Sequence, residues 1–344
     1  MKKYLGNIIK LAVSLGIGIG LIYLFVHQMT DNDKQHVVND IKRANYFWVL
    51  MGPFVGLISN YFRTQRWRLL LKPLGYQPRF LNTFMSVLIM YFFNLFFPRL
   101  GEVSRCGVLA RYEHVPVEKG VGTMVLERLT DVVCLGIVWI MLLVFEHDKF
   151  TSLFNTDWNT KFADIIAKYN ISPTVKYGVL GAVLLIIIIF LAAQLRRKGF
   201  KNITASIWER VKGLWLGLIS IKDISNPFEF LFHSIMIWVC YFLMIYLSFR
   251  MFPETASLGI GAGALCLFFG GIAYSLTPGG LGLYPIFIQL ILTLYGITSS
   301  AAISMGLVAW SAQTAFVLLA GVVSLILLAI LNREPALEEV TVKS

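Results

Sequence analysis

Residues 80–101 read FLNTFMSVLIMYFFNLFFPRLG, and residues 258–282 read LGIGAGALCLFFGGIAYSLTPGGLG. Each stretch is an apolar run that stops at a proline close to glycine. Proline removes a backbone donor and glycine frees the chain to turn, so each stretch predicts a broken helix. A shorter arm follows each break, at residues 103–112 and 285–295. The two stretches therefore predict two helical hairpins.

The rest of the chain is dominated by apolar stretches long enough to cross a membrane as helices. They cover residues 8–26, 46–62, 121–145, 175–195, 228–249 and 303–331. Of 344 residues, 57% are apolar and only 14% are charged, which excludes an ordinary soluble chain and leaves no room for a sizeable soluble catalytic domain. The first stretch has no small-residue cleavage site, so we expect a retained helix. The composition predicts an all-α polytopic membrane protein with about six full transmembrane helices.

Loop charges give the expected orientation, because basic loops stay on the cytoplasmic side. Segments 63–79 and 196–227 are strongly basic, whereas 146–173 carries three lysines against four acids. This bias is satisfied if the first broken run enters and leaves on the cytoplasmic side and the second enters from outside. We therefore expect two re-entrant hairpins and both termini in the cytoplasm. The net charge of +11 is explained by this topology, so no nucleic-acid partner is expected.

A shift of 180 residues places Pro98 on Pro278 and aligns the surrounding apolar runs in the same order. The chain, 1–344, is thus predicted to be a single integral membrane domain of two inverted-topology repeats, 1–150 and 151–332, with a short cytoplasmic tail at 333–344. A chance match between similar apolar helices is the alternative. Inverted halves with paired broken helices indicate a transporter site near the bilayer midplane, because irregular backbone is tolerated there only where it lines a cavity.

Charged residues occur within the expected span at 121–145, although each costs about 2.5 to 3.5 kcal/mol on insertion scales. Glu127 and Asp131 are four residues apart and share one helix face, and Arg128 can pair with Asp131. We expect a cation or a proton beside Glu127. A solvated or structural cluster at the cytoplasmic end of the helix is the alternative.

The first hairpin adds further polar residues beside its break. These are Asn94, Arg99, Glu102 and Arg105. Arginine suits a phosphate or carboxylate because its planar fork donates two hydrogen bonds and keeps its charge. An anionic lipid headgroup is the expected ligand.

Two other groups of residues are candidates for lipid binding. Arg63 and Arg66, beside Trp67, can collect anionic lipid at the cytoplasmic surface, or can serve only as an interfacial anchor. In the second hairpin, glycines can let the backbone approach a ligand, and a purely structural turn explains them equally well. The residues concerned are Gly279, Gly280, Gly282 and Tyr284.

These residues give the chain a resemblance to a known family. The motifs are Arg63-x-x-Arg66-Trp67, Asn94-x-x-x-Pro98-Arg99-x-Gly101-Glu102-x-x-Arg105, Glu127-Arg128-x-x-Asp131 and Pro278-Gly279-Gly280-Leu281-Gly282. Together they resemble the lysylphosphatidylglycerol synthase transmembrane-region family, which includes the flippase half of the multiple peptide resistance factor. The resemblance implies lipid translocation across the bacterial cytoplasmic membrane, with the charged residues of the middle two motifs at the family's polar positions.

Two departures from the family pattern affect this expectation. Related sequences commonly have a glutamate a few residues after the Pro-Gly-Gly turn, where this chain has Leu283-Tyr284-Pro285. Coupling through that position is therefore in doubt. The chain also stops at Ser344, without the soluble aminoacyl-transferase domain of the two-part enzymes, so lysyl transfer is not expected.

The sequence thus predicts a flippase-like lipid translocase for an anionic or aminoacylated phospholipid or another lipid-linked headgroup. Arg99 and Arg105 are expected to hold the anionic group, and Glu127 and Asp131 a cationic substituent or a coupling proton. No histidine cluster or metal-binding cysteine spacing is present, so no enzyme activity, metal or cofactor is expected. A homodimer is left open. The alternatives are an integral-membrane lipid-modifying transferase and a non-transporting scaffold or regulator.

Overall fold

The structure is a computed structural model, and it describes residues 31–96, 100–149, 151, 224 and 226–332. All regular secondary structure in these ranges is helical. Residues up to 139 and from 224 onward belong to one compact unit, and the described residues from 140 to 151 belong to a second. The site described below lies wholly within the first unit.

The helices confirm most of the expected boundaries. Their bounds are α2 (Asp31–Arg43), α3 (Tyr46–Leu71), η1 (Lys72–Leu74), α4 (Phe80–Phe96), α5 (Leu100–Glu113), α6 (Val117–Phe145), α11 (Pro227–Ser248), η3 (Phe249–Met251), α12 (Ile260–Leu276), η4 (Pro278–Gly280), α13 (Leu283–Leu294) and α14 (Ser299–Leu331). The polar helix α2 was not predicted. The expected spans at 8–26 and 175–195 lie outside the described residues.

Within the described ranges, three helices are long and apolar enough to cross a membrane: Val117–Phe145, Pro227–Met251 and Ser299–Leu331. They contain three of the predicted spans. The total of about six transmembrane helices, the orientation of the helices and the inverted repeats stay predictions.

Helix α3 is longer than the predicted span. It begins where the Asn45 side chain accepts a hydrogen bond from the Phe47 N–H, and it continues through Arg63 to Leu71. The helix therefore continues past the end of the predicted span at 46–62 and into the basic segment that follows it. Arginine is a good helix former, and the guanidinium groups of Arg63 and Arg66 find partners on other helices, so charge does not end the helix here.

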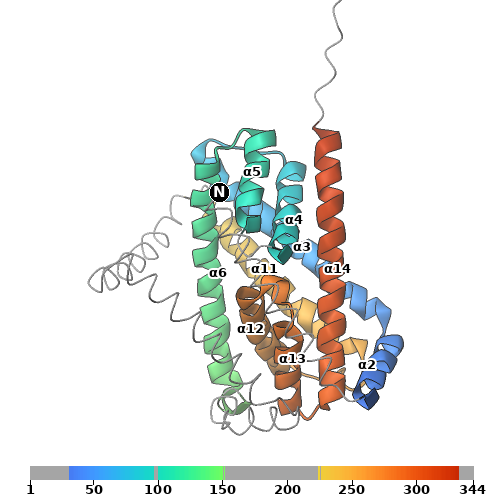
Figure 1. The fold of residues 1–344 in the computed structure, drawn as a ribbon. Helices are drawn as coiled ribbons and strands as arrows, with labels where there is room; N and C mark the ends of the chain where they lie inside the picture. Colours follow the sequence, from blue (N-terminus) through green and yellow to red (C-terminus); the bar gives the residue numbers. More distant parts are fainter. Residues whose placement is uncertain (1–30, 97–99, 150, 152–223, 225, 333–344) are drawn as a thin grey trace, which may run out of the picture. The chain divides into compact units, whose positions relative to one another are not determined.

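The first predicted hairpin is formed by α4 and α5, which pack side by side (Figure 1). The Gly101 N–H donates to Asn94 Oδ1 at 3.0 Å, which joins the end of α4 to the start of α5. A Cβ atom on Gly101 would lie 1.9 Å from the Met90 carbonyl oxygen, so the arms pack this closely only because this residue is glycine. The break predicted from the sequence is therefore also a packing contact.

The second hairpin consists of α12, the η4 turn and α13. Gly279 and Gly280 both have positive φ, at 57° and 73°, which favours glycine. The Gly279 carbonyl accepts from Trp310 Nε1 of α14 at 2.8 Å, and a Cβ on Gly279 would meet Leu95 of α4 at 2.5 Å. The turn of the second hairpin is therefore packed against the end of α4, and α14 contacts both hairpins (Figure 1).

An apolar core fixes α3 against the first hairpin. Its buried members are Trp67, Leu71, Val87, Met90, Cys106, Leu109 and Val115. Burial of this surface from three helices holds α3 and α5 in a fixed register, and this register determines where their charged side chains lie.

Polar side chains tie the base of the first hairpin to the end of α14. Glu113 accepts from Arg79 Nε at 3.0 Å and from the Arg79 backbone N–H at 2.9 Å. Asn332 accepts from Arg79 Nη2 at 2.7 Å, and its amide donates to Asn82 Oδ1 at 3.1 Å. Glu113 is therefore the acceptor on which this junction depends.

The Asn82 amide also donates to Glu113 Oε1. Replacing Glu113 with Ala is expected to lower the free energy of unfolding by about 2 kcal/mol, because the hydrogen bonds from Arg79 are lost and the Asn82 amide loses a partner. The thermal unfolding midpoint in detergent measures the loss. Glu254→Ala, at an exposed loop position, is the control and should leave the midpoint unchanged. Equal midpoints for the two variants would contradict the role of Glu113.

Candidate functional site

Helix α3 carries two arginines that are almost completely buried. Arg63 and Arg66 are three residues apart, so they project from one face of the helix, and their exposed fractions are 2% and 0%. Both contact Asp131 of α6: Arg66 Nη1 lies 2.9 Å from Oδ1, and Arg63 Nη1 lies 3.5 Å from Oδ2. One carboxylate thus bridges two arginines from a neighbouring helix.

A second buried ion pair joins α5 to α6. Arg105 pairs with Glu127, and neither side chain is exposed. Glu127 Oε1 also lies 3.7 Å from Arg66 Nε, so this carboxylate is shared. The Arg105 guanidinium stacks on Trp67, with Cζ 4.3 Å from the ring centroid, and Trp67 Nε1 donates to Thr123 Oγ1 at 2.9 Å. The stacking and the ion pair together fix Arg105 in place.

The cluster becomes more exposed toward Arg128. This side chain is 43% exposed, and it lies 3.2 Å from Glu102 Oε1 of α5 and 3.6 Å from Asp131 Oδ2. Glu102 and Asp131 are 19% and 15% exposed. This edge is therefore the accessible side of an otherwise buried group of charges.

Hydroxyl groups from α4 and α11 complete the cluster. Arg63 Nη2 donates to Tyr241 Oη at 2.7 Å, and the Tyr241 and Tyr91 hydroxyls are 3.0 Å apart. Arg66 Nη1 lies 3.4 Å from Ser234 Oγ. Tyr91, Tyr241 and Ser234 were not predicted from the sequence. Their signal is a hydroxyl within a long apolar helix, because such a group needs a partner when it is buried.

We call these charged residues the arginine–carboxylate cluster. Its members are Arg63, Arg66, Glu102, Arg105, Glu127, Arg128 and Asp131. Four guanidinium groups against three carboxylates leave a net charge of +1. Within the described part of the chain, the buried guanidinium atoms without a hydrogen-bond acceptor are Arg63 Nε and Nη1, Arg66 Nε and Nη2, Arg105 Nε and Nη1, and Arg128 Nε. One buried carboxylate oxygen of the cluster, Glu127 Oε1, is likewise without a hydrogen-bond donor. The unpaired guanidinium nitrogens still outnumber it, and the cluster is suited to hold an oxygen-rich anion.

The structure brings together seven of the predicted site residues, all of them in this cluster. The predicted Asn94 instead caps the first hairpin through Gly101. Gly279, Gly280, Gly282 and Tyr284 lie in and just after the turn of the second hairpin, where Tyr284 packs edge-on against Tyr274. Arg99 lies outside the described residues. Burial of Arg63 and Arg66 does not fit the interfacial-anchor alternative. The binding roles of all these residues stay predictions.

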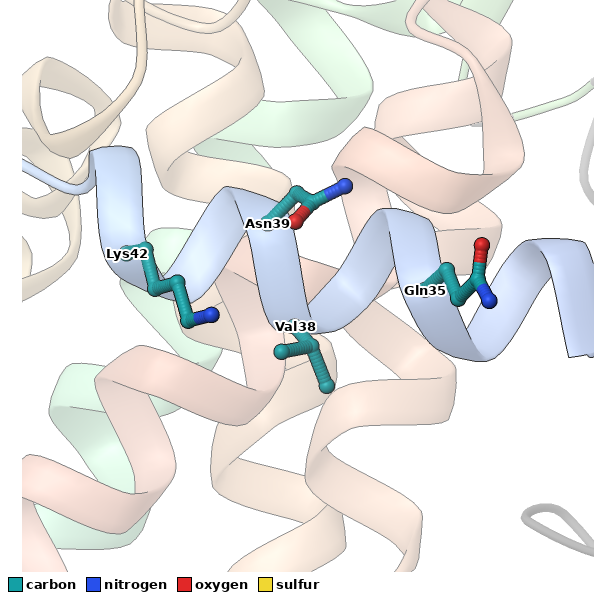
Figure 2. A pocket seen from close by; sticks show the side chains of 4 residues that line it. All are labelled: Gln35, Val38, Asn39 and Lys42. Atoms are coloured by element: carbon teal, nitrogen blue, oxygen red, sulfur yellow. The ribbon is translucent and has the colours of Figure 1, made fainter.

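A hollow of about 350 Å³ lies elsewhere, beside α2. Figure 2 shows the four described side chains that line it, Gln35, Val38, Asn39 and Lys42, along this one helix. None of them belongs to the arginine–carboxylate cluster. This hollow therefore does not identify the site.

The fold and the cluster define a membrane protein in which apolar helices enclose a buried group of arginines and carboxylates. The chain belongs to the family described as the lysylphosphatidylglycerol synthase TM region, which matches residues 7–321. This match confirms the resemblance found in the sequence. It supports a lipid-related function in a membrane.

A relative in Methanocaldococcus jannaschii, described as "UPF0104 membrane protein MJ1595", is 28% identical over 98 residues. The match covers 28% of this chain and 29% of that relative. The chain therefore matches less than a third of the relative's length. No solved structure matches this chain.

Proposed function

We propose that the protein is a lipid translocase that moves an anionic or aminoacylated phospholipid, or another lipid-linked headgroup, across the bacterial cytoplasmic membrane. The observation that carries this proposal is the excess of buried guanidinium donors over acceptors in the arginine–carboxylate cluster. A cluster that served only to hold helices together would gain most from matched hydrogen-bond partners, because a buried donor left without an acceptor is costly. A phosphodiester supplies the missing acceptors.

The main barrier to translocation is transfer of the ionic headgroup out of water, because hydrocarbon offers it no hydrogen bonds. Arginines that are already positioned by Trp67 and by ion pairs replace the water around the phosphate. The carboxylates of Glu127 and Asp131 hold the same arginines when no lipid is bound. Because the arginines remain paired with carboxylates while their free donors bind the phosphate, the lipid does not compensate their whole charge, and binding stays reversible, as transport requires.

The two hairpins supply the route in this proposal. Both are re-entrant, they belong to inverted repeats, and both termini are cytoplasmic. The contact of the Gly279 turn with the end of α4 supports a path along which the hairpins meet. For an aminoacylated headgroup, Glu127 and Asp131 also receive the cationic substituent or the coupling proton, while Arg99 and Arg105 hold the phosphate.

Translocation is tested in vesicles that contain the purified protein and fluorescent phosphatidylglycerol, with chemical quenching of the outer leaflet as the measurement. We expect Arg128→Gln to slow translocation about tenfold, equivalent to ~1.4 kcal/mol in the barrier. Arg128 is the partly exposed arginine of the cluster, so its loss should spare the fold.

Arg111→Gln on α5 is the matched control, because Arg111 is exposed and lies over Tyr112 rather than in the cluster. It should translocate lipid at the unsubstituted rate. A rate no higher than in protein-free vesicles would reject the translocase, and headgroup modification without translocation would favour the transferase alternative. An unchanged rate for Arg128→Gln would remove the cluster from the mechanism.

A further inference from the structure

We propose that Tyr91 and Tyr241, together with the unpaired edge of Arg63, form a subsite that binds the non-bridging oxygens of a lipid phosphodiester. The inference rests on the proposed function for its phospholipid ligand. It adds two uncharged residues to the headgroup site and assigns them to the phosphate rather than to any substituent beyond it.

The hydroxyl groups of Tyr91 and Tyr241 have one more proton than they have acceptors among the residues that the structure describes. Tyr241 Oη accepts from Arg63 Nη2, and one hydroxyl proton is shared between Tyr241 and Tyr91. Two phenols have two protons, but the contact between them uses only one. Both tyrosines are half-buried, and within the described residues their hydroxyls make no further hydrogen bond. Whichever tyrosine donates to the other, one O–H is left to bind a ligand.

Arg63 adds unpaired donors of its own at the same place. It is 2% exposed, and its Nε and Nη1 atoms have no hydrogen-bond acceptor within the described ranges. Nη1 is 3.5 Å from Asp131 Oδ2, which is an ion-pair distance rather than a hydrogen bond. Arg63 and the tyrosine pair thus present unpaired N–H donors and one free O–H at the same place.

This chemistry selects the ligand class. An ammonium group would meet the guanidinium charge of Arg63 here, and a phenolic oxygen, although it can accept a hydrogen bond, carries no negative charge to compensate for that repulsion. A phosphodiester has two anionic oxygens that can accept several hydrogen bonds. The subsite is formed by Arg63 of α3, Tyr91 of α4 and Tyr241 of α11. A phosphate bound there therefore contacts the first hairpin and α11 at the same time. Phosphate binding is therefore coupled to the packing of that hairpin.

The test uses Tyr91→Phe, which removes the hydroxyl and keeps the ring that lies 6.0 Å from Arg63 Cζ. Binding of phosphatidylglycerol and of phosphatidylmethanol to the full-length protein in detergent is measured by titration with native mass spectrometry. Both lipids are monoanionic phosphodiesters, but phosphatidylmethanol has no headgroup hydroxyl. We expect both to bind about tenfold more weakly, the effect of losing one hydrogen bond to a charged acceptor.

Tyr61→Phe is the matched control, because Tyr61 lies on the exposed face of α3 and contacts Gln65. It should bind both lipids normally. Tyr241→Phe also removes the acceptor of Arg63 Nη2, so it should weaken binding at least as much as Tyr91→Phe. All measurements use the monodisperse, folded fraction, for which the thermal midpoint is recorded.

Three results separate the possible failures. Unchanged binding of both lipids to Tyr91→Phe and Tyr241→Phe overturns the subsite, even if the parent protein translocates lipid. Weaker binding of phosphatidylglycerol alone overturns the phosphate assignment, because the tyrosines would then contact the glycerol hydroxyls. Tyrosine-dependent binding of both lipids without translocation in vesicles supports the subsite and rejects the translocase.

Discussion

Glu127→Ala is expected to lower the free energy of unfolding by about 3 to 5 kcal/mol, because it leaves buried guanidinium charge without its partner. Arg105 and Glu127 are both completely buried, and Arg66 loses a carboxylate at 3.7 Å. Water cannot replace the carboxylate without opening the contact between α5 and α6. The measurement is denaturant unfolding in detergent, together with the yield of monodisperse protein.

Two further variants show whether buried charge is the cause. Glu118→Ala removes an exposed acid from the first turn of the same helix and should have little effect on stability. Replacing Arg105 and Glu127 together with Met should recover much of the loss, because an apolar pair needs no counter-charge. The double variant should still fail to translocate lipid. If Glu127→Ala is as stable as the parent, water reaches the Arg105–Glu127 ion pair, and the cluster is not shielded from solvent.

Gly101→Ala is expected to destabilise the protein by about 3 kcal/mol, because overpacking forces the backbone to shift. The new Cβ would lie 1.9 Å from the Met90 carbonyl oxygen and 2.7 Å from Asn94 Oδ1. The Met90 oxygen belongs to the backbone, so α4 and α5 must move apart. This movement displaces Arg105 from Glu127, and we expect both the thermal midpoint and the translocation rate to fall.

Gly107→Ala provides the matched control on α5. A Cβ at Gly107 meets nothing within 4 Å, so this change should be neutral or should stabilise the helix by up to ~1 kcal/mol. The contrast between the two variants measures the close approach of the hairpin arms and removes the general effect of placing alanine in a helix. Similar midpoints for Gly101→Ala and Gly107→Ala would refute the close approach.

Several features were predictable from the sequence because their causes are local. The proline and glycine residues after Leu276 end α12 through backbone chemistry, wherever the surrounding chain lies. Long apolar runs predicted α6, α11 and α14 within a few residues. The charged residues of α6 were recognised because charge is costly in an apolar helix. For the same reason, the sequence predicted that they would have partners.

The residues that pair with these charges could not be predicted from the sequence. Arg63 and Arg66 follow an apolar run, and a sequence pattern cannot distinguish a basic loop from a helix whose arginines are paired across the fold. Tyr91 and Tyr241 are 150 positions apart in the chain, and the sequence gives no sign that their hydroxyls meet. The role of Asn94 as a hairpin cap depends on how closely α5 returns to α4.

The sequence alone thus determined a helical membrane protein with two interrupted helices and with charge where hydrocarbon disfavours it, because backbone chemistry and transfer from water act on each segment separately. Tertiary structure decided which charges share a carboxylate, which hydroxyls join them and which donors stay unpaired. Those outcomes depend on distances of a few ångströms between side chains from α3, α4, α5, α6 and α11. Such distances are set by how buried surfaces of different helices fit together, and this fit involves residues that are far apart in the chain.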